Sequence, residues 1–316
     1  MKWRNETITV KTPSRVHMGL IDLNGEIGRV DGGFGLALKD PGIEISASKS
    51  DELFVKGQHR ERALDAALKF MKACNIEGGA ELTIDSAYQN HIGLGLGTQL
   101  TIGVGYVLSK LYKIDKSPRE IAEMLGRGGT SGIGVAAFES GGFIVDGGHP
   151  ANEKKGFFPS SKSTAKPAPI IARYDFPDWK IALVTPRGEE ISGEREADIF
   201  QKNCPIPKSE VQSLSHTVLM KMLPAVVEKD ITSFGESVNE IQNIGFKKIE
   251  VGLQKQAVKN LLTRCQKVCF GAGLSSFGPT IYCIVDDEEK LADVVAGEGK
   301  ITFTQADNNG VKIGGK

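Results

Sequence analysis

A glycine-rich run stands before a helix-like apolar pattern in the first third of the chain. It reads Gly93-Leu94-Gly95-Leu96-Gly97-Thr98-Gln99, and apolar residues follow it at helical spacing. The first amides of a helix are unpaired and its dipole adds positive potential, so such a loop can bind an anion. Glycine permits the close approach that a Cβ would block, although a tight turn whose glycines only pack is the alternative. We therefore expect phosphate contacts from Gly93, Gly95, Gly97, Thr98, Gln99 and Thr101.

Two common nucleotide-binding motifs are excluded by the sequence. It contains no G-x-x-x-x-G-K-[ST], so a P-loop of that type is not expected. A second glycine turn at 128–134 looks like the dinucleotide motif of short-chain dehydrogenases, and Tyr106 and Lys110 imitate their catalytic pair. That motif should follow the first strand, whereas here it follows a predicted helix. We therefore do not expect a dinucleotide-binding dehydrogenase.

The composition limits which binding partners and which cellular compartment are to be expected for this protein. The chain has 39 Lys and Arg against 39 Asp and Glu, and this zero net charge disfavours nucleic-acid binding. The five cysteines form no C-x-x-C pair and no signal-like apolar segment follows Met1, so we expect reduced thiols in a cytoplasmic protein. From Ser86 to Ser109 no charged residue occurs, but glycines and polar groups there favour a loop and then a buried helix, with no membrane contact.

Strands and helices come in blocks along the first half. Alternating apolar residues predict strands, with a turn at Asp40-Pro41-Gly42 before the third of them, near 7–10, 15–20, 43–47, 53–55 and 80–84. Helical spacing predicts helices at 60–71 and 100–111. Ser117-Pro118-Arg119-Glu120 has the serine cap, early proline and later glutamate of a helix start.

The second half repeats this mixture of elements. Its predicted strands and helices lie at 180–185, 211–222, 231–241, 253–262, 280–285, 291–295 and 301–304, and 271–276 is predicted to be a turn. Such blocks indicate an α+β architecture in two layers. The chain is long enough for about two domains. The polar stretch 150–169 marks the predicted boundary, which gives domains 1–160 and 161–316.

Three glycine motifs in order resemble those of the GHMP kinase superfamily. They are the Gly93 to Gln99 loop, Ser131-Gly132-Ile133-Gly134 with Gly141-Gly142 after it, and Phe270-Gly271-Ala272-Gly273 before a strand. The resemblance covers nearly the whole chain. It implies a GHMP-kinase-like two-domain fold, with a ribosomal-protein-S5-like N-terminal domain and a ferredoxin-like C-terminal domain. It also implies that ligand phosphates are held at these motifs, which adds Ser131, Gly271 and Gly273 to the phosphate-binding candidates.

The chain departs from the kinases where their chemistry is done. Mevalonate-type kinases carry a catalytic Asp at the position of Gly134, and a glycine cannot take a proton. These departures are similar to one branch of the superfamily, the β-ribofuranosylaminobenzene 5'-phosphate synthases. That branch carries G-L-G-S-G-T-Q-L, matched by 93–100 except that Leu96 replaces Ser. It also has an N-terminal segment matched by Pro13-Ser14-Arg15-Val16-His17-Met18-Gly19-Leu20-Ile21-Asp22.

The branch resemblance implies a reaction and its ligands. Phosphoribosyl pyrophosphate would be joined to 4-aminobenzoate, or to 4-hydroxybenzoate, with loss of CO2 and pyrophosphate, in the methanopterin biosynthesis of archaea. Mg²⁺ would neutralise the pyrophosphate oxygens. Glu123 lies eight residues before Ser131, which is the spacing of the metal-binding Glu in mevalonate-type kinases, so it is the candidate Mg²⁺ ligand.

The N-terminal segment supplies the catalytic candidates. Arg15 and His17 alternate on one predicted strand and share a face, so they could hold the 5'-phosphate or the benzoate carboxylate. A core histidine is the alternative for His17, and Asp22 could contact a second metal ion or the ribose. Further candidates flank the second glycine turn or lie beside Gly188: Glu139, Asp146, His149 and Arg187.

Two other functions stay open at the level of sequence. One is an ATP-dependent small-molecule kinase of the mevalonate or homoserine type. The other is a catalytically silent binding protein with the same fold. For any of the three we expect a homodimer, because twofold dimers are the commonest soluble oligomers.

Overall fold

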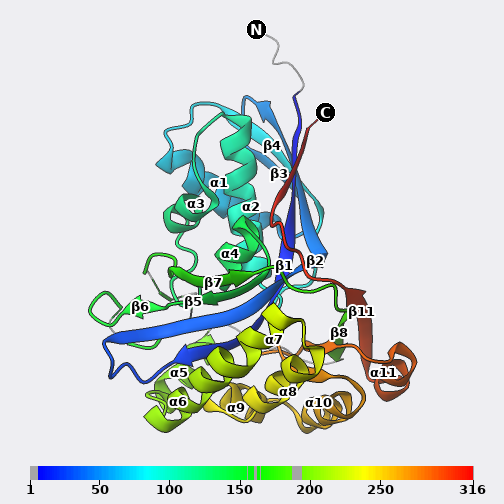
Figure 1. The fold of residues 1–316 in the computed structure, drawn as a ribbon. Coiled ribbons are helices and arrows are strands. Elements are labelled where there is room, and N and C mark those ends of the chain that lie inside the picture. Colours follow the sequence, from blue (N-terminus) through cyan, green and yellow to red (C-terminus); the bar gives the residue numbers. More distant parts are fainter. Residues whose placement is uncertain (1–5, 155, 160–161, 164, 187–193, 316) are drawn as a thin grey trace.

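Two long antiparallel strands form the backbone of the first sheet. The computed structural model describes residues 6–154, 156–159, 162–163, 165–186 and 194–315. Strands β1 (Ile8–Asp22) and β2 (Arg29–Ser50) pair along most of their length, and helices lie on both sides of them (Figure 1). The order within this sheet is β12-β1-β2-β4-β3; β5 and β6 also pair with β2, and β7 pairs with β5. The bounds of the shorter strands are β3 Phe54–Gly57, β4 Gly79–Ser86, β5 Phe143–Asp146, β6 His149–Pro150, β7 Ile170–Tyr174 and β12 Lys312–Gly315.

A second, antiparallel sheet has the order β11-β8-β10-β9. Its strands are β8 Ile181–Pro186, β9 Gly271–Leu274, β10 Ile281–Ile284 and β11 Gly299–Thr304. The helices of this half are α5 Glu194–Asn203, α6 Lys208–Thr217, the π-helix η1 Val218–Met222, α7 Leu223–Glu228, α8 Ile231–Ile241, α9 Gly245–Gly252, α10 Gln256–Val268 and α11 Glu288–Val295. In Figure 1 helices α5 to α10 lie below the long strands.

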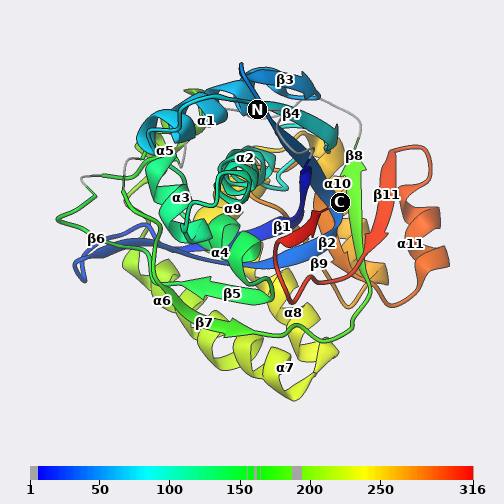
Figure 2. The ribbon, with the colours of Figure 1, turned by 90° about the horizontal axis from the view of Figure 1, so that it is seen from above.

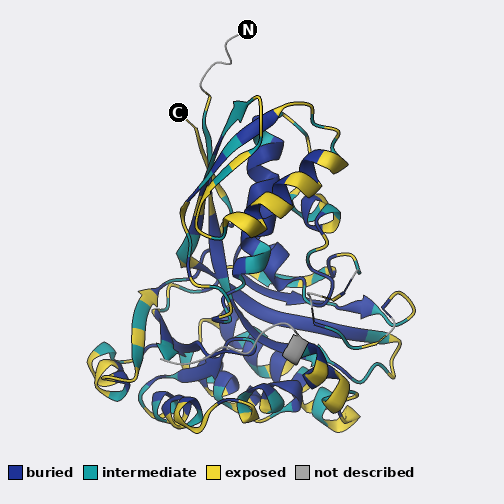
Figure 3. Ribbon diagram, turned by 180° about the vertical axis from the view of Figure 1, so that it is seen from behind, coloured by how far each residue is buried: buried dark blue, intermediate teal, exposed yellow. Residues whose placement is uncertain are grey.

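The first sheet packs on the helices of the N-terminal half. These are α1 Arg60–Ala73, α2 Leu96–Leu111, α3 Pro118–Met124 and α4 Ile133–Glu139. Helix α2 lies at the centre of the view from above (Figure 2) and is buried nearly all round (Figure 3). A Cβ on Gly103 would lie 2.8 Å from Ile45 Cδ1, and one on Gly105 2.6 Å from Ile121 Cγ2. The two glycines therefore let neighbouring elements approach the helix that carries the glycine loop.

Several predicted elements are confirmed. The loop and buried helix expected after Ser86 are present, and α3 begins with a capping box between Ser117 and Glu120. None of the helices in the described ranges combines the length and apolar character needed to cross a lipid bilayer.

The predicted turn at Asp40-Pro41-Gly42 is wrong. Strand β2 continues through these residues, and the pairing with β1 shifts register between Thr12 and Ser14. Proline has no amide to donate to a sheet, so Pro13 and Pro41 are accommodated in this irregularity rather than in a turn. A Cβ on Gly42 would lie 2.6 Å from the Thr12 carbonyl oxygen, so a glycine allows the strands to stay together.

The second half differs from prediction in two places. Residues 271–274 form the buried strand β9, so the turn predicted at 271–276 is partly wrong. Helices α5 and α9 were not predicted, because their apolar residues are few or continuous with those of neighbouring helices. The boundary at residue 160 stays a prediction, and beyond it the chain returns twice to the first sheet, as β7 and β12.

Candidate active site

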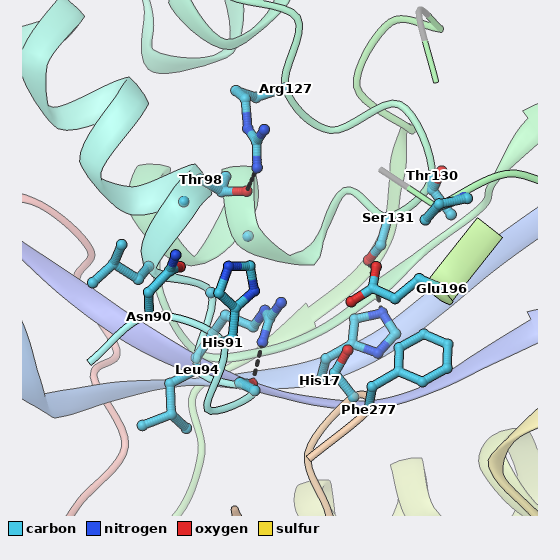
Figure 4. Close-up of a pocket in the computed structure, with 18 of the residues that line it drawn as sticks. His17, Asn90, His91, Leu94, Thr98, Arg127, Thr130, Ser131, Glu196 and Phe277 are labelled. Carbon is cyan, nitrogen blue, oxygen red and sulfur yellow. Dashed lines mark hydrogen bonds between the residues drawn. The ribbon is translucent and has the colours of Figure 1, made fainter. Parts of the chain in front are cut away.

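A cavity of about 370 Å³ lies where the glycine loop, β1 and the start of α5 meet. The predicted residues that line it are Arg15, His17, Gly93, Gly95, Gly97, Thr98, Thr101 and Ser131. Its two ends differ in chemistry. Arg127 and Thr98 lie at one end, and Glu196 and Phe277 at the other, with His17 beside them (Figure 4).

Side chains from two other segments hold the glycine loop in place through a backbone carbonyl group of the loop. Gly95 caps helix α2 with φ of 80°, and Gly93 has φ of 86°. The Gly93 carbonyl oxygen accepts a hydrogen bond from Arg15 Nη1 at 2.6 Å and another from Ser275 Oγ at 2.7 Å. The loop therefore joins β1 to the end of β9, and the two halves of the chain meet at the cavity.

Gln99 and Gly134 connect α2 to α4. Gln99 is fully buried and donates from Nε2 to the Gly134 carbonyl oxygen at 2.7 Å, so it fixes the two helices and does not line the cavity. A Cβ on Gly134 would lie 3.1 Å from Thr98 Cγ2. The threonine thus occupies the space beside the position where the kinases carry their catalytic Asp.

Three guanidinium groups converge on the glycine loop. Arg127 Nη2 donates to Thr98 Oγ1 at 2.9 Å, while a Cβ on Gly97 would lie 2.6 Å from Arg62 Nη1. Burial, together with the charges of Arg62 and Arg15, lowers the pKa of Arg127 to about 10. Within the described ranges the arginine ion pairs involve Arg173 and Arg264, which lie elsewhere. Three arginines therefore gather at this end of the cavity, and none of them forms an ion pair with a residue that the structure describes, which suits an anion site.

A hydrogen-bonded chain runs from His17 through Ser131 to Asp146. Asp146 Oδ2 accepts from the Gly132 amide at 2.8 Å and lies 3.4 Å from Ser131 Oγ. His17 Nε2 lies 3.0 Å from Ser131 Oγ, which also accepts from the Ile133 amide at 3.3 Å. If the serine hydroxyl donates to the carboxylate, His17 Nε2 must donate to the serine.

The charge state of the His17 imidazole follows from its surroundings, and the direction of the hydrogen bonds would fix which ring nitrogen carries the proton. Burial, together with the charges of Arg15 and Lys247, lowers the pKa of His17 well below its usual range, so the ring is neutral. With the proton on Nε2, Nδ1 carries a lone pair. Nδ1 is buried and has no hydrogen-bond partner in the described part of the chain.

The pH dependence of stability reports on Asp146. Burial raises its pKa to about 6 from an ordinary 3.8. The protonated carboxyl therefore favours the folded state, and this stability is lost as pH rises from about 4 through 6. We expect Asp146→Asn, which does not titrate, to remove that loss. The wild-type free energy of unfolding minus that of the variant should fall by about 2 kcal/mol between pH 4 and pH 7, measured by urea denaturation. A difference independent of pH would contradict the assignment.

The other end of the cavity is apolar but carries carboxylates. Leu20, Phe200 and Phe277 line it, and the two phenyl centroids are 6.3 Å apart. Of the carboxylates that line the cavity, Asp65 pairs with Lys69 at 2.7 Å and Glu250 pairs with the buried Lys247. Glu196 makes no hydrogen bond or ion pair with any residue that the structure describes. Burial and the charge of Glu250 raise the pKa of Glu196 to about 7, against the opposing effect of Arg15.

Several predicted residues are not brought to the cavity. Asp22 Oδ1 accepts from the amides of Asn24 and Gly25, at 2.8 and 3.0 Å, and holds a turn. Glu123 is 46% exposed and pairs with Lys166 at 3.0 Å. Gly271 and Gly273 lie in β9, where they allow Gly235 of α8 and the side chain of Tyr282 to approach. A buried strand with paired amides cannot cradle a phosphate, which explains why the third motif does not contribute.

The further candidates have other positions. His149 Nδ1 donates to Asp31 Oδ2 at 2.7 Å, and Lys154 Nζ donates to both Asp31 and Thr130 Oγ1 in the same buried network. This network supports the segment that carries Ser131. Glu139 is exposed, and Arg187 lies outside the described residues.

Sequence reasoning missed Arg62, Arg127 and Glu196. Arg127 directly precedes the second glycine turn, which was a usable signal. Arg62 lies on a helix that is mostly exposed, so its position gives no sign of a ligand. Glu196 belongs to a helix that was not predicted.

Two protein-family models and several named relatives match this chain. Residues 61–142 match the model of the GHMP kinases N terminal domain, and 222–297 match GHMP kinases C terminal. A protein of Archaeoglobus fulgidus named beta-ribofuranosylphenol 5'-phosphate synthase is 49% identical over 97% of this chain and 99% of its own length. One of the same name from Methanocaldococcus jannaschii is 47% identical over 96% of this chain and 99% of its own.

Solved structures agree on the fold. Homoserine kinase from Cytophaga hutchinsonii superimposes with a TM-score of 0.69 and 15% identity over 99% of this chain and 98% of its own. Mevalonate kinase from Methanococcus jannaschii gives a TM-score of 0.68 and 15% identity over 95% and 98% of the two chains. The predicted two-domain α+β fold of the GHMP kind is confirmed.

Proposed function

The chain belongs to the family of beta-ribofuranosylphenol 5'-phosphate synthases within the GHMP kinase superfamily, and on this premise we propose that it is a decarboxylating pentosyltransferase. It condenses phosphoribosyl pyrophosphate with 4-hydroxybenzoate or 4-aminobenzoate. A bond forms between ribose C1 and the ring carbon that carries the carboxylate. Pyrophosphate leaves ribose C1, and CO2 leaves the ring with its bonding electron pair remaining there. This step belongs to methanopterin biosynthesis.

One observation carries the proposal: a single cavity joins an end lined by three arginines to an end lined by phenylalanines. Arg15, Arg62 and Arg127 suit the phosphate groups of the donor, since a planar guanidinium binds phosphate in a fixed, often bidentate geometry. Phe200 and Phe277 suit a flat aromatic acceptor. An enzyme that joins a phosphorylated sugar to an aromatic acid must bind the two substrates next to each other, which a single cavity with these two ends allows.

The residues of the glycine loop then act on the leaving group. Donors fixed around a developing charge stabilise it without reorganisation, and the arginines at Gly95 and Gly97 are already in place. Loss of CO2 replaces loss of a ring proton, so no base is needed at Gly134. Phosphoryl transfer as in the kinases would lack its carboxylate at that position.

We propose that Mg²⁺ enters with the donor. Glu123 does not fit a metal ligand of this cavity, because it is at the surface and paired with Lys166. Within the described ranges no cluster of three His, Cys, Asp or Glu side chains could hold a metal ion. Mg²⁺ commonly keeps its waters and binds through substrate phosphates, so a protein cage is not required.

The test is CO2 release. Purified protein with Mg²⁺ and phosphoribosyl pyrophosphate is expected to release labelled CO2 from carboxyl-labelled 4-hydroxybenzoate or 4-aminobenzoate, with pyrophosphate in equal amount. Formation of ADP from ATP with mevalonate or homoserine would instead establish the kinase. Ligand-induced thermal stabilisation without turnover in either assay would indicate a binding protein. The homodimer, the cytoplasmic location and the lack of nucleic-acid binding stay predictions.

A further inference from the structure

Glu196 stands out among the carboxylates of the cavity. Asp65 and Glu250 each form an ion pair with a lysine. Glu196 has none in the described part of the chain, although its side chain is partly buried and lines the cavity. Placing an unpaired carboxylate in such a site costs stability. A role in binding or proton transfer would account for it.

The position of Glu196 indicates what it would contact. It lies on α5 four residues before Phe200, so both side chains project from the same face of the helix. Phe277 lies close by on the segment after β9 (Figure 4). An aromatic ring bound against these phenyl groups would present its edge to the carboxylate. The cationic end, by contrast, is formed by Arg62, Arg127 and the glycine loop.

We propose that Glu196 accepts a hydrogen bond from the para hydroxyl or amino group of the aromatic acceptor and takes its proton as the ring attacks ribose C1. This inference rests on the proposed function. Attack through the carbon that bears the carboxylate places positive charge on the ring, chiefly at the para heteroatom. Transfer of its proton to a Glu196 oxygen leaves a neutral dienone or its imine.

The same group closes the cycle. When CO2 leaves, the electron pair of the broken carbon–carbon bond restores the aromatic ring and flows to the para heteroatom. That atom then takes the proton back from Glu196, so no net proton is consumed and the carboxylate is regenerated. No oxidant, reductant or additional reactant is required.

The electrostatic setting of Glu196 suits this exchange. The charged groups that act on it are Arg15 on β1 and Glu250 on α9, which is paired with Lys247. Their balance and its burial hold the pKa of Glu196 at about 7. A base is most effective when its pKa lies near the operating pH, because it is deprotonated yet still binds a proton well.

The experiment compares Glu196→Gln with Asp198→Asn, an exposed carboxylate two residues along the same helix. We expect Glu196→Gln to lower kcat for CO2 release from 4-hydroxybenzoate by about 100-fold or more, the range for loss of a general base. KM for the donor should change by no more than about threefold. The acidic limb of the kcat/KM profile near pH 7 should disappear, since kcat/KM reports the pKa values of the free enzyme, and Asp198→Asn should behave as wild type.

Two results would overturn the proposal. One is activity of Glu196→Gln within about threefold of wild type. The other is a raised Mg²⁺ requirement with an unchanged acidic limb, which would make Glu196 a metal contact.

A binding measurement separates this inference from the proposed function. With inorganic pyrophosphate present, Glu196→Gln should bind 4-hydroxybenzoate about tenfold more weakly, the difference between a charged and a neutral acceptor, yet bind benzoate as wild type does. If Glu196→Gln binds 4-hydroxybenzoate as tightly as wild type does, Glu196 does not contact the para hydroxyl group. This result would hold even if the wild type releases no CO2.

Discussion

Replacing Gly93 by alanine is expected to destabilise the protein by about 3 kcal/mol or more, through αL strain and overpacking. Gly93 has φ of 86°, where a Cβ is strained, and the added Cβ would lie well under 3.0 Å from the backbone oxygen of Ser275. The loop cannot move away, because Arg15 and Ser275 both hold the Gly93 carbonyl. Urea denaturation measures the change, and CO2 release should be lost with it.

Gly28 offers a matched control for this prediction. Its φ is 83°, but a Cβ there would meet nothing within 4 Å. Gly28→Ala should therefore cost only the backbone strain, about 1 to 2 kcal/mol. Equal destabilisation by the two substitutions would show that the contact with Ser275 is unimportant. A large difference would locate the constraint at the junction of the loop and β9.

Arg127→Met is expected to weaken binding of the donor without lowering the free energy of unfolding of the protein. The guanidinium is charged at some cost, since burial and two neighbouring arginines lower its pKa to about 10. Removing it relieves that repulsion, so the free energy of unfolding without ligand should not fall. Hydrogen bonds to charged groups contribute about 1.5 to 3 kcal/mol each, so KM for phosphoribosyl pyrophosphate should rise by about 10- to 100-fold. Steady-state kinetics and urea denaturation measure the two quantities.

Arg264→Met is the control for the loss of a cation. Arg264 forms a surface pair with Glu298 at 2.6 Å, far from the lining residues of the cavity. Donor binding should be unchanged by that substitution. If Arg127→Met instead destabilised the protein and left KM unchanged, Arg127 would be a support for Thr98, through the bond at 2.9 Å, and not a donor contact.

The local signals of the sequence predicted the glycine loop and the elements around it. A serine cap, an early proline and a glutamate three residues on are enough to start α3, because the capping bonds are made within one turn. The loop before α2 follows from its glycines and from the absence of charged residues between Ser86 and Ser109. These features depend on neighbours in the chain, which a sequence displays directly.

Features that depend on distant contacts could not be predicted in this way. Arg62 lies on an exposed helix, and only the fold turns its guanidinium toward Gly97. Glu123 has the spacing of a metal ligand, but the fold leaves it beside Lys166. Gly271 and Gly273 have the composition of a phosphate loop, yet their glycines serve the packing of β9. Glycine alone does not distinguish a ligand's approach from that of another segment.

The return of β7 and β12 to the first sheet makes the two halves dependent on each other for folding. A fragment ending at residue 160 would lack the partners of β5 and of the start of β1, and would expose two unpaired strand edges that favour association. The halves are therefore not autonomous folding units, and equilibrium unfolding of the whole chain should follow one cooperative transition. Any attempt to isolate the glycine loop with its sheet must retain 170–174 and 312–315.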